Sequence, residues 1–161
     1  MRTSQFLRLP ARQREAYTRA VEAVSLMRHE GLSLKAAAQR TGTSPQTVLR
    51  YARSALWYSS ARREWRPRQH DNLLRQMSVT TPGGRTEQVL VRGSREAAKV
   101  ARWQSAVAHF QRTGDEHFLR RLRHKSFVDA AGRRHRLPTD PSQLEGWIEV
   151  GAIDIDEVQT P

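Results

Sequence analysis

The 161-residue chain contains no cysteine. This absence excludes disulfide bonds, cysteine-ligated zinc sites and thiol catalysis. The chain also lacks a run of about eighteen apolar residues, which a membrane-spanning helix would need. Its first segment, MRTSQFLRLPARQRE, has no apolar core of the signal-peptide type. We therefore expect a cytoplasmic protein with no membrane partner.

Catalytic motifs are missing as well. There is no HExxH pair and no GxSxG segment, and the glycine-rich stretches lack the lysine and the spacing of a phosphate-binding loop. His117 and His124, near Asp115 and Glu116, could hold the metal of a nuclease, but an arginine-rich stretch surrounds them. We therefore predict no enzymatic activity, no cofactor and no metal site.

Positive charge is what the chain has in excess. It carries 28 basic and 16 acidic residues, a net charge of +12, and its lysines are only Lys35, Lys99 and Lys125. Such an excess attracts polyanions, of which nucleic acid is the usual one. Arginine, which supplies the rest of the charge, matches phosphate and guanine edges with paired donors.

The most informative stretch is residues 32–52, LSLKAAAQRTGTSPQTVLRYA. Ser33 is a good N-cap for a first short helix, and Gly42 suits the left-handed turn that ends it. Ser44 can cap a second helix with Pro45 in its first turn, where a missing N–H is harmless. The pattern predicts two helices joined by a tight turn.

This pattern resembles the helix-turn-helix of bacterial repressors, resolvases and transposases. The matching residues are Ala37 and Ala38 in the first helix, Gly42 in the turn, the Ser44–Pro45 start and Val48 in the second helix. The resemblance implies that the second helix lies in the major groove of DNA. The alternative is a glycine-linked helix pair with no DNA role.

The flanking residues extend this unit. Residues 11–29 have a helical apolar stripe formed by Tyr17, Val21, Val24 and Met27, whereas residues 1–10 are expected to form a loose arm. The second helix of the pair is expected to continue towards Leu56. We predict a three-helix DNA-binding domain over residues 1–56.

Residues 57–76 are expected to form a basic, aromatic linker. Arginines alternate there with Trp57, Tyr58 and Trp65. Such a mixture can follow a nucleic-acid backbone and stack on bases. Equally, the segment can be a helical linker whose aromatic side chains cover the first domain.

Residues 77–161 are predicted to form a second domain of mixed α+β structure, so the fold class is α+β. Its first expected elements are a hairpin over 77–92 and a helix over 94–113. A short helix after Asp115 is expected to bury Phe118, Leu119 and Leu122. A hairpin pairing 127–128 with 135–137, a helix from Asp140 and a strand over 152–158 are expected to follow. Val100, Trp103, Val107 and Phe110 form a stripe that is either core or a face for a homodimer.

Charge is distributed unevenly along the chain. Residues 1–76 have a net charge of +10, residues 77–139 one of +8, and residues 140–161 one of −6. The second domain therefore offers an auxiliary basic surface, which is either a phosphate contact or simply a solvated face. It consists of Arg120, Arg121, Arg123, Lys125, Arg133, Arg134 and Arg136.

These observations predict a sequence-specific protein that binds double-stranded DNA, a small bacterial or phage transcription regulator associated with the nucleoid. The expected base-reading residues are Ser44, Gln46, Thr47, Arg50 and Arg53. The expected phosphate-binding residues are Arg28, Ser33, Lys35, Arg40, Thr43, Arg62, Arg63, Arg66 and Arg68. The alternative is a non-catalytic docking module of a nucleoprotein assembly, which binds RNA or a protein.

Overall fold

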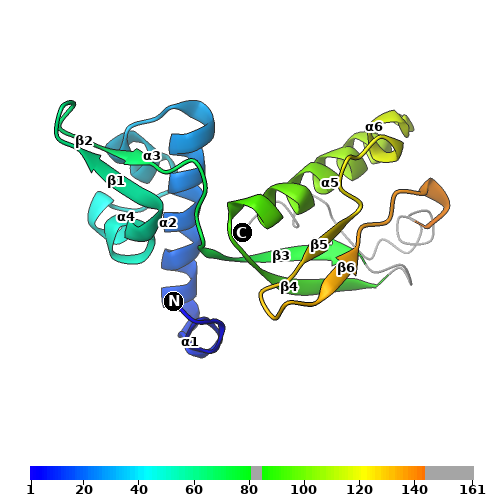
Figure 1. Cartoon of the computed structure of the whole chain (residues 1–161), viewed down its shortest axis with the longest axis horizontal. Coiled ribbons are helices and arrows are strands. Elements are labelled where there is room, and N and C mark those ends of the chain that lie inside the picture. The colour runs from blue at the N-terminus through cyan, green and yellow to red at the C-terminus, as the bar shows by residue number, and fades with distance from the viewer. Residues whose placement is uncertain (81–84, 144–161) are drawn as a thin grey trace. The chain divides into compact units, whose positions relative to one another are not determined.

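The computed structural model describes residues 1–80 and 85–143, which form an α+β fold (Figure 1). The chain divides into two compact units, Met1–Arg75 and Gln76–Pro161. The first unit is mostly helical, and the second combines helices with short antiparallel strands, as the sequence predicts.

The first unit is built around the long helix α2 (Ala11–Glu30), whose predicted apolar stripe is buried. Helices α3 (Leu34–Arg40) and α4 (Pro45–Ala52) both pack against it. The turn between them contains Gly42 at φ 69°, a left-handed conformation that penalises residues with a Cβ. The predicted three-helix arrangement is confirmed. The buried residues that join the three helices are Tyr17, Ala20, Val21, Val24, Met27, Ala37, Ala38, Val48 and Ala52.

The N-terminal residues do not form a loose arm. A short helix α1 (Thr3–Arg8) buries Phe6, whose ring meets that of Tyr17 edge to face at 5.4 Å between centroids. Phe6 is the one buried residue of α1, and a single buried position cannot produce a periodic pattern, so the sequence does not predict this helix. The aromatic contact orders the segment instead.

The prediction of a linker over residues 57–76 is wrong. Helix α4 ends at Ala52, and a 3₁₀ turn η1 (Arg53–Ala55) leads directly into a β-hairpin. Strands β1 (Leu56–Ser59) and β2 (Glu64–Pro67) pair antiparallel, with Trp57 opposite Arg66 and Tyr58 opposite Trp65. The hairpin belongs to the first unit, and α4 does not continue to Leu56. Neither strand buries every second residue, so the sequence shows no alternating pattern here.

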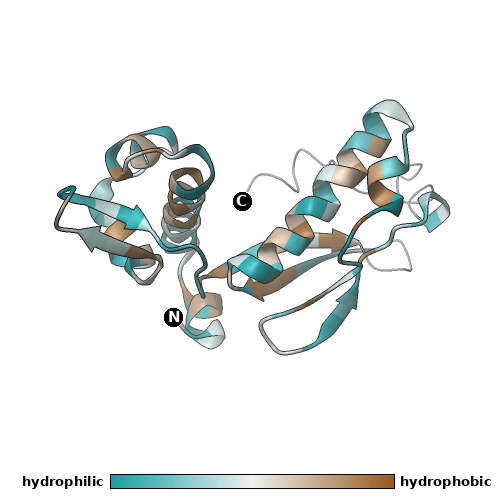
Figure 2. Ribbon diagram, turned by 45° about the horizontal axis from the view of Figure 1, so that its top comes forward, coloured by the Kyte–Doolittle hydropathy of each residue, from teal (hydrophilic) through white to brown (hydrophobic). Residues whose placement is uncertain are grey.

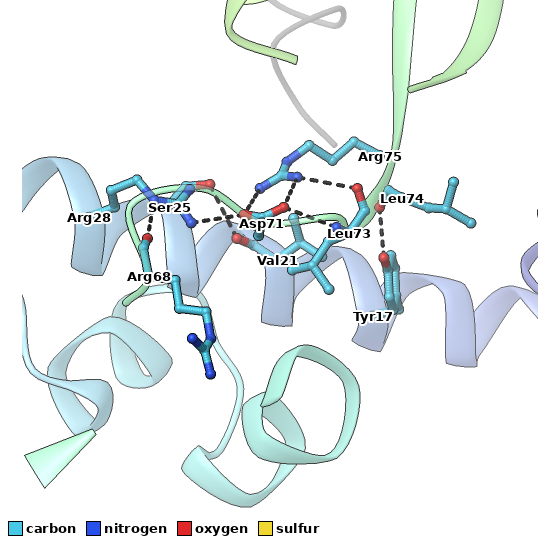
Figure 3. Close-up of polar contacts among 9 residues, drawn as sticks. All are labelled: Tyr17, Val21, Ser25, Arg28, Arg68, Asp71, Leu73, Leu74 and Arg75. Atoms are coloured by element: carbon cyan, nitrogen blue, oxygen red, sulfur yellow. Dashed lines mark hydrogen bonds and ion pairs between the residues drawn. The ribbon is translucent and has the colours of Figure 1, made fainter. Parts of the chain in front are cut away.

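A buried carboxylate closes the first unit (Figure 3). Asp71 forms ion pairs with Arg28 of α2 at 2.8 Å and with Arg75 at 2.7 Å, and one of its oxygens accepts the N–H of Leu73 at 3.0 Å. The hydroxyl of Tyr17 donates to the carbonyl of Leu74 at 2.8 Å. These bonds hold the end of the unit against α2.

In the second unit, the helix α5 (Ser94–Thr113) packs on strands. The hairpin β3 (Leu74–Thr80) and β4 (Thr86–Arg92) precedes it, and the short helix α6 (His117–Arg120) and the hairpin β5 (Ser126–Val128) and β6 (Arg134–Arg136) follow. Figure 2 shows hydrophobic and hydrophilic residues alternating along α5. Its stripe residues Val100, Trp103 and Val107 are buried in the core with Val91 and Phe127, and the partly buried Phe110 packs against this core.

The predicted burial of the residues of α6 is only partly correct. Leu119 is buried as expected and Leu122 is half-buried, but Phe118 is 55% exposed, because the single turn of α6 can turn only one side towards α5. Residues 81–84 and 144–161 lie outside the described residues, and with them the predicted hairpin turn, most of the predicted last helix and the predicted final strand.

Candidate nucleic-acid interface

The start of α4 is set by a side-chain cap. The hydroxyl of Ser44 accepts the N–H of Thr47 at 3.2 Å and lies 2.9 Å from the Thr47 hydroxyl. Both residues are half-buried. Ser44 and Thr47, two of the predicted base-reading residues, are therefore partly occupied in holding the helix, which is what an N-cap does.

The outward face of α4 carries the other predicted base-reading residues. Gln46 and Arg50 are exposed and lie one turn apart, while Val48 and Ala52 on the opposite side are fully buried. Arg53, also exposed, follows one turn later. The helix is thus anchored on one side and offers an amide and two guanidinium groups on the other.

Both guanidinium groups lie on aromatic rings. Arg50 lies 5.3 Å from the ring centre of Tyr51, which itself meets Tyr17 edge to face. Arg53 lies 5.5 Å from the ring centre of Trp65 on β2. Cation–π contact limits the positions that a long side chain samples. Arg53 therefore links α4 to the hairpin, a connection that no sequence pattern indicated because residues 53 and 65 come from different elements.

The hairpin places further positive charge near the end of α4. Arg62 and Arg63 are exposed in the turn between the strands, and Arg63 adopts the left-handed φ of 52°, which is uncommon for a residue other than glycine. Arg66 is half-buried and lies 3.7 Å from Glu64, while the side chain of Arg68 is exposed. The structure thus brings these four predicted phosphate-binding residues onto or beside one hairpin.

The predicted phosphate-binding residues around α3 differ in their exposure and in their bonds to other residues. Lys35 is exposed in the first turn, and Ser33 caps the helix by accepting the N–H of Ala36. Thr43 is half-buried in the turn before α4, and Arg40 forms an exposed ion pair with Glu30. Lys35 is the cation of this group with no ion pair to a described residue.

Arg28, a predicted phosphate-binding residue, is instead engaged inside the first unit. Its guanidinium is held by Asp71, and its Nε also donates to the carbonyl of Arg68 at 3.0 Å. Only 15% of the side chain is exposed. The sequence could not reveal this, because the carboxylate that captures Arg28 lies 43 positions further along the chain.

The auxiliary basic residues of the second unit lie on α6, on the last hairpin and between these elements. Arg120 is paired with Glu116 at 2.7 Å, and Arg134 donates to the hydroxyl of Ser126. Arg121 and Arg123 are exposed at and after the end of α6, whereas Lys125, Arg133 and Arg136 are exposed on or beside the last hairpin.

Asp115, a candidate metal ligand in the sequence, forms local hydrogen bonds. Asp115 lies 3.3 Å from Nε2 of His109 and accepts the N–H of His117 at 3.0 Å, and these bonds lower its pKa. Within residues 1–80 and 85–143, no group of three histidine or carboxylate side chains could hold a metal.

No helix in the described part of the chain is both long and apolar enough to cross a membrane. No family model, curated protein or solved structure matches the chain.

Proposed function

We propose that the first unit binds double-stranded DNA by laying α4 in the major groove, with the β1–β2 hairpin on the neighbouring backbone. The observation that carries this proposal is the two-sided character of α4. Val48 and Ala52 fix one side in the core, while Gln46 and Arg50 are exposed on the other. A helix presented in this way, after a glycine turn, is what major-groove reading requires.

In this proposal Arg50 reads guanine and Gln46 reads adenine, because their side chains offer the matching paired hydrogen bonds. The exposed cations Lys35, Arg62 and Arg63 contact phosphates and fix the register. Such a protein is a small transcription regulator, and binding to chromosomal DNA would place it on the nucleoid.

The decisive experiment is selection of bound fragments from random duplex DNA, followed by binding of variants to the selected site. Arg50→Ala should cost about 1–3 kcal/mol and relax the preference at one base pair, whereas Lys35→Ala should weaken binding to all sequences alike. Arg12→Ala is the matched control, since Arg12 is exposed on α2 outside this surface. If no sequence is enriched, or if Arg50→Ala behaves as Arg12→Ala does, the proposal fails.

A second candidate function is docking to a protein or an RNA in a larger assembly. The side chains of Trp57 and Tyr58 on β1 favour it, because they are 43% and 51% exposed. Exposed aromatic residues are enriched at protein interfaces. Binding that is independent of duplex sequence and lost in Trp57→Ala would support this function over the regulator.

A further inference from the structure

A groove lies between α5 and α6 in the second unit, with a volume of about 950 Å³. Arginines surround it, and Ala101, Ala106, Ala108, Phe118 and Leu122 supply its apolar surface. None of the described residues that line it is acidic. The sequence does not indicate this groove, because Arg102 and Arg112 lie on α5, whose apolar stripe indicates a core helix.

The positive charge of the groove is largely unneutralised. Arg102, Arg121 and Arg123 form no ion pair with any residue in the described ranges, and Arg112 approaches only Nδ1 of His109, at 3.4 Å. Like charges gathered around one concave surface repel each other unless an anion binds there. Guanidinium groups are suited to phosphate in particular.

Phe118 adds a flat apolar surface among these charges. It is 55% exposed, and its ring is held by two perpendicular contacts, at 4.9 Å to His109 and 5.5 Å to His117. A large apolar side chain exposed inside a basic groove suits a ligand with a ring of its own next to its negative charge.

We propose that this groove binds a nucleotide unit of a single-stranded nucleic acid, with the base stacked on Phe118 and the phosphates held by Arg102, Arg121 and Arg123. A duplex does not fit this role because its bases are stacked on each other, whereas the bases of a single strand are free to stack on protein rings. The site lies within the second unit and does not depend on duplex binding by the first.

The test measures binding of a labelled oligothymidylate of about eight nucleotides to the full chain by fluorescence anisotropy. Phe118→Ala should weaken binding at least about fivefold, whereas Phe118→Trp, which keeps an aromatic ring, should retain it. The logarithm of the binding constant falls linearly with the logarithm of the salt concentration, and Arg121→Ala should make this slope shallower by about 0.7, which is the contribution of one phosphate on a single strand. Since Phe118 and Arg121 are exposed, these variants should fold, which circular dichroism checks.

Arg95→Ala is the matched control, because Arg95 is an exposed arginine of α5 that does not line the groove. The proposal is overturned if Phe118→Ala and Arg121→Ala bind the oligonucleotide as Arg95→Ala does. This result is independent of Arg50→Ala and the selected duplex, so the failure of one proposal leaves the other standing.

Two further measurements identify the ligand. If adenosine monophosphate displaces the oligonucleotide, the groove is a nucleotide site whose ligand is a free nucleotide. If the complex persists, the ligand is a single-stranded nucleic acid. An acidic peptide with apolar residues is the competing class of ligand. A synthetic peptide with the sequence of residues 144–161, LEGWIEVGAIDIDEVQTP, represents it. If this peptide binds in a Phe118-dependent manner and the oligonucleotide does not, the groove is a protein-docking site and the proposal is wrong.

Discussion

Asp71 is a charged residue inside the first unit, and its environment explains why it stays ionised. Burial alone would raise the pKa of its carboxyl group, but bonds from Arg75, Arg28 and the N–H of Leu73 lower that pKa from 3.8 to about 2. A carboxyl group whose pKa is lower in the folded protein than in the unfolded chain stabilises the fold when it is ionised. This stabilisation is present above about pH 4 and is lost as the pH falls from about 4 to 2.

Asp71→Asn should therefore lower the free energy of unfolding at pH 7 by about 2–3 kcal/mol, because Arg28 and Arg75 lose their counter-charge in a largely buried position. Urea denaturation at several pH values measures this. The difference from the wild type should shrink between pH 4 and 2. Glu15→Gln is the control, since it breaks only an exposed pair with Arg19 and should cost at most about 0.5 kcal/mol. A difference that stays constant across this pH range would show that Asp71 does not act through its charge.

Ser44 has two possible roles, and they can be separated. If Ser44 acts as the N-cap of α4, Ser44→Ala should lower the free energy of unfolding by about 1 kcal/mol. Ser44→Thr keeps a capping hydroxyl and should lower it less. Thermal unfolding measures the stability, and binding to the selected site measures recognition. If Ser44→Ala changes the preferred base while the melting temperature is unaffected, Ser44 reads DNA and its capping role is minor.

At the scale of elements, α4 and the β1–β2 hairpin act as one surface because Arg53 lies on Trp65. Trp65 in turn meets Tyr58 edge to face at 5.5 Å across the two strands. The hairpin therefore fixes the last cation of the helical surface, in addition to carrying its own arginines.

A double-mutant cycle tests this coupling. Arg53→Ala and Trp65→Leu should each weaken duplex binding. The double variant should lose about 0.5–1 kcal/mol less binding free energy than the sum of the two single losses. Fluorescence anisotropy with the selected duplex provides the affinities. Trp57→Leu, on the opposite face of the same hairpin, is the matched control for loss of an aromatic ring. Strict additivity would mean that the helix and the hairpin contact DNA independently.

For the whole molecule, the two units differ in net charge, because the six acidic residues of 140–161 offset most of the positive charge of the second unit. Residues 1–75 have a net charge of +10 and residues 76–161 one of +2. The long-range attraction to a duplex should therefore come from the first unit, while the second acts through its local groove.

The salt dependence of duplex binding measures this division. If Lys35, Arg62 and Arg63 each neutralise one phosphate, the logarithm of the binding constant should fall with the logarithm of salt concentration with a slope of about −3. Replacing Arg62 and Arg63 together with alanine should reduce the slope by about two. Arg121→Ala in the second unit should leave it unchanged, and an equal loss in both variants would contradict the division.

The sequence alone determined the features that depend on neighbours along the chain. Helical spacing placed the stripes of α2 and α5. Ser33 and Gly42 marked the beginning and the end of α3, and Ser44 marked the beginning of α4, because capping and left-handed turns act within a few residues.

Only the tertiary structure decided what depends on distant partners. It assigned Arg28 to Asp71, Phe6 to Tyr17 and Arg53 to Trp65, and it formed the groove around Phe118 from two helices. A charge pattern gives the number of arginines, but whether an arginine meets solvent or a carboxylate is set by residues that folding brings beside it.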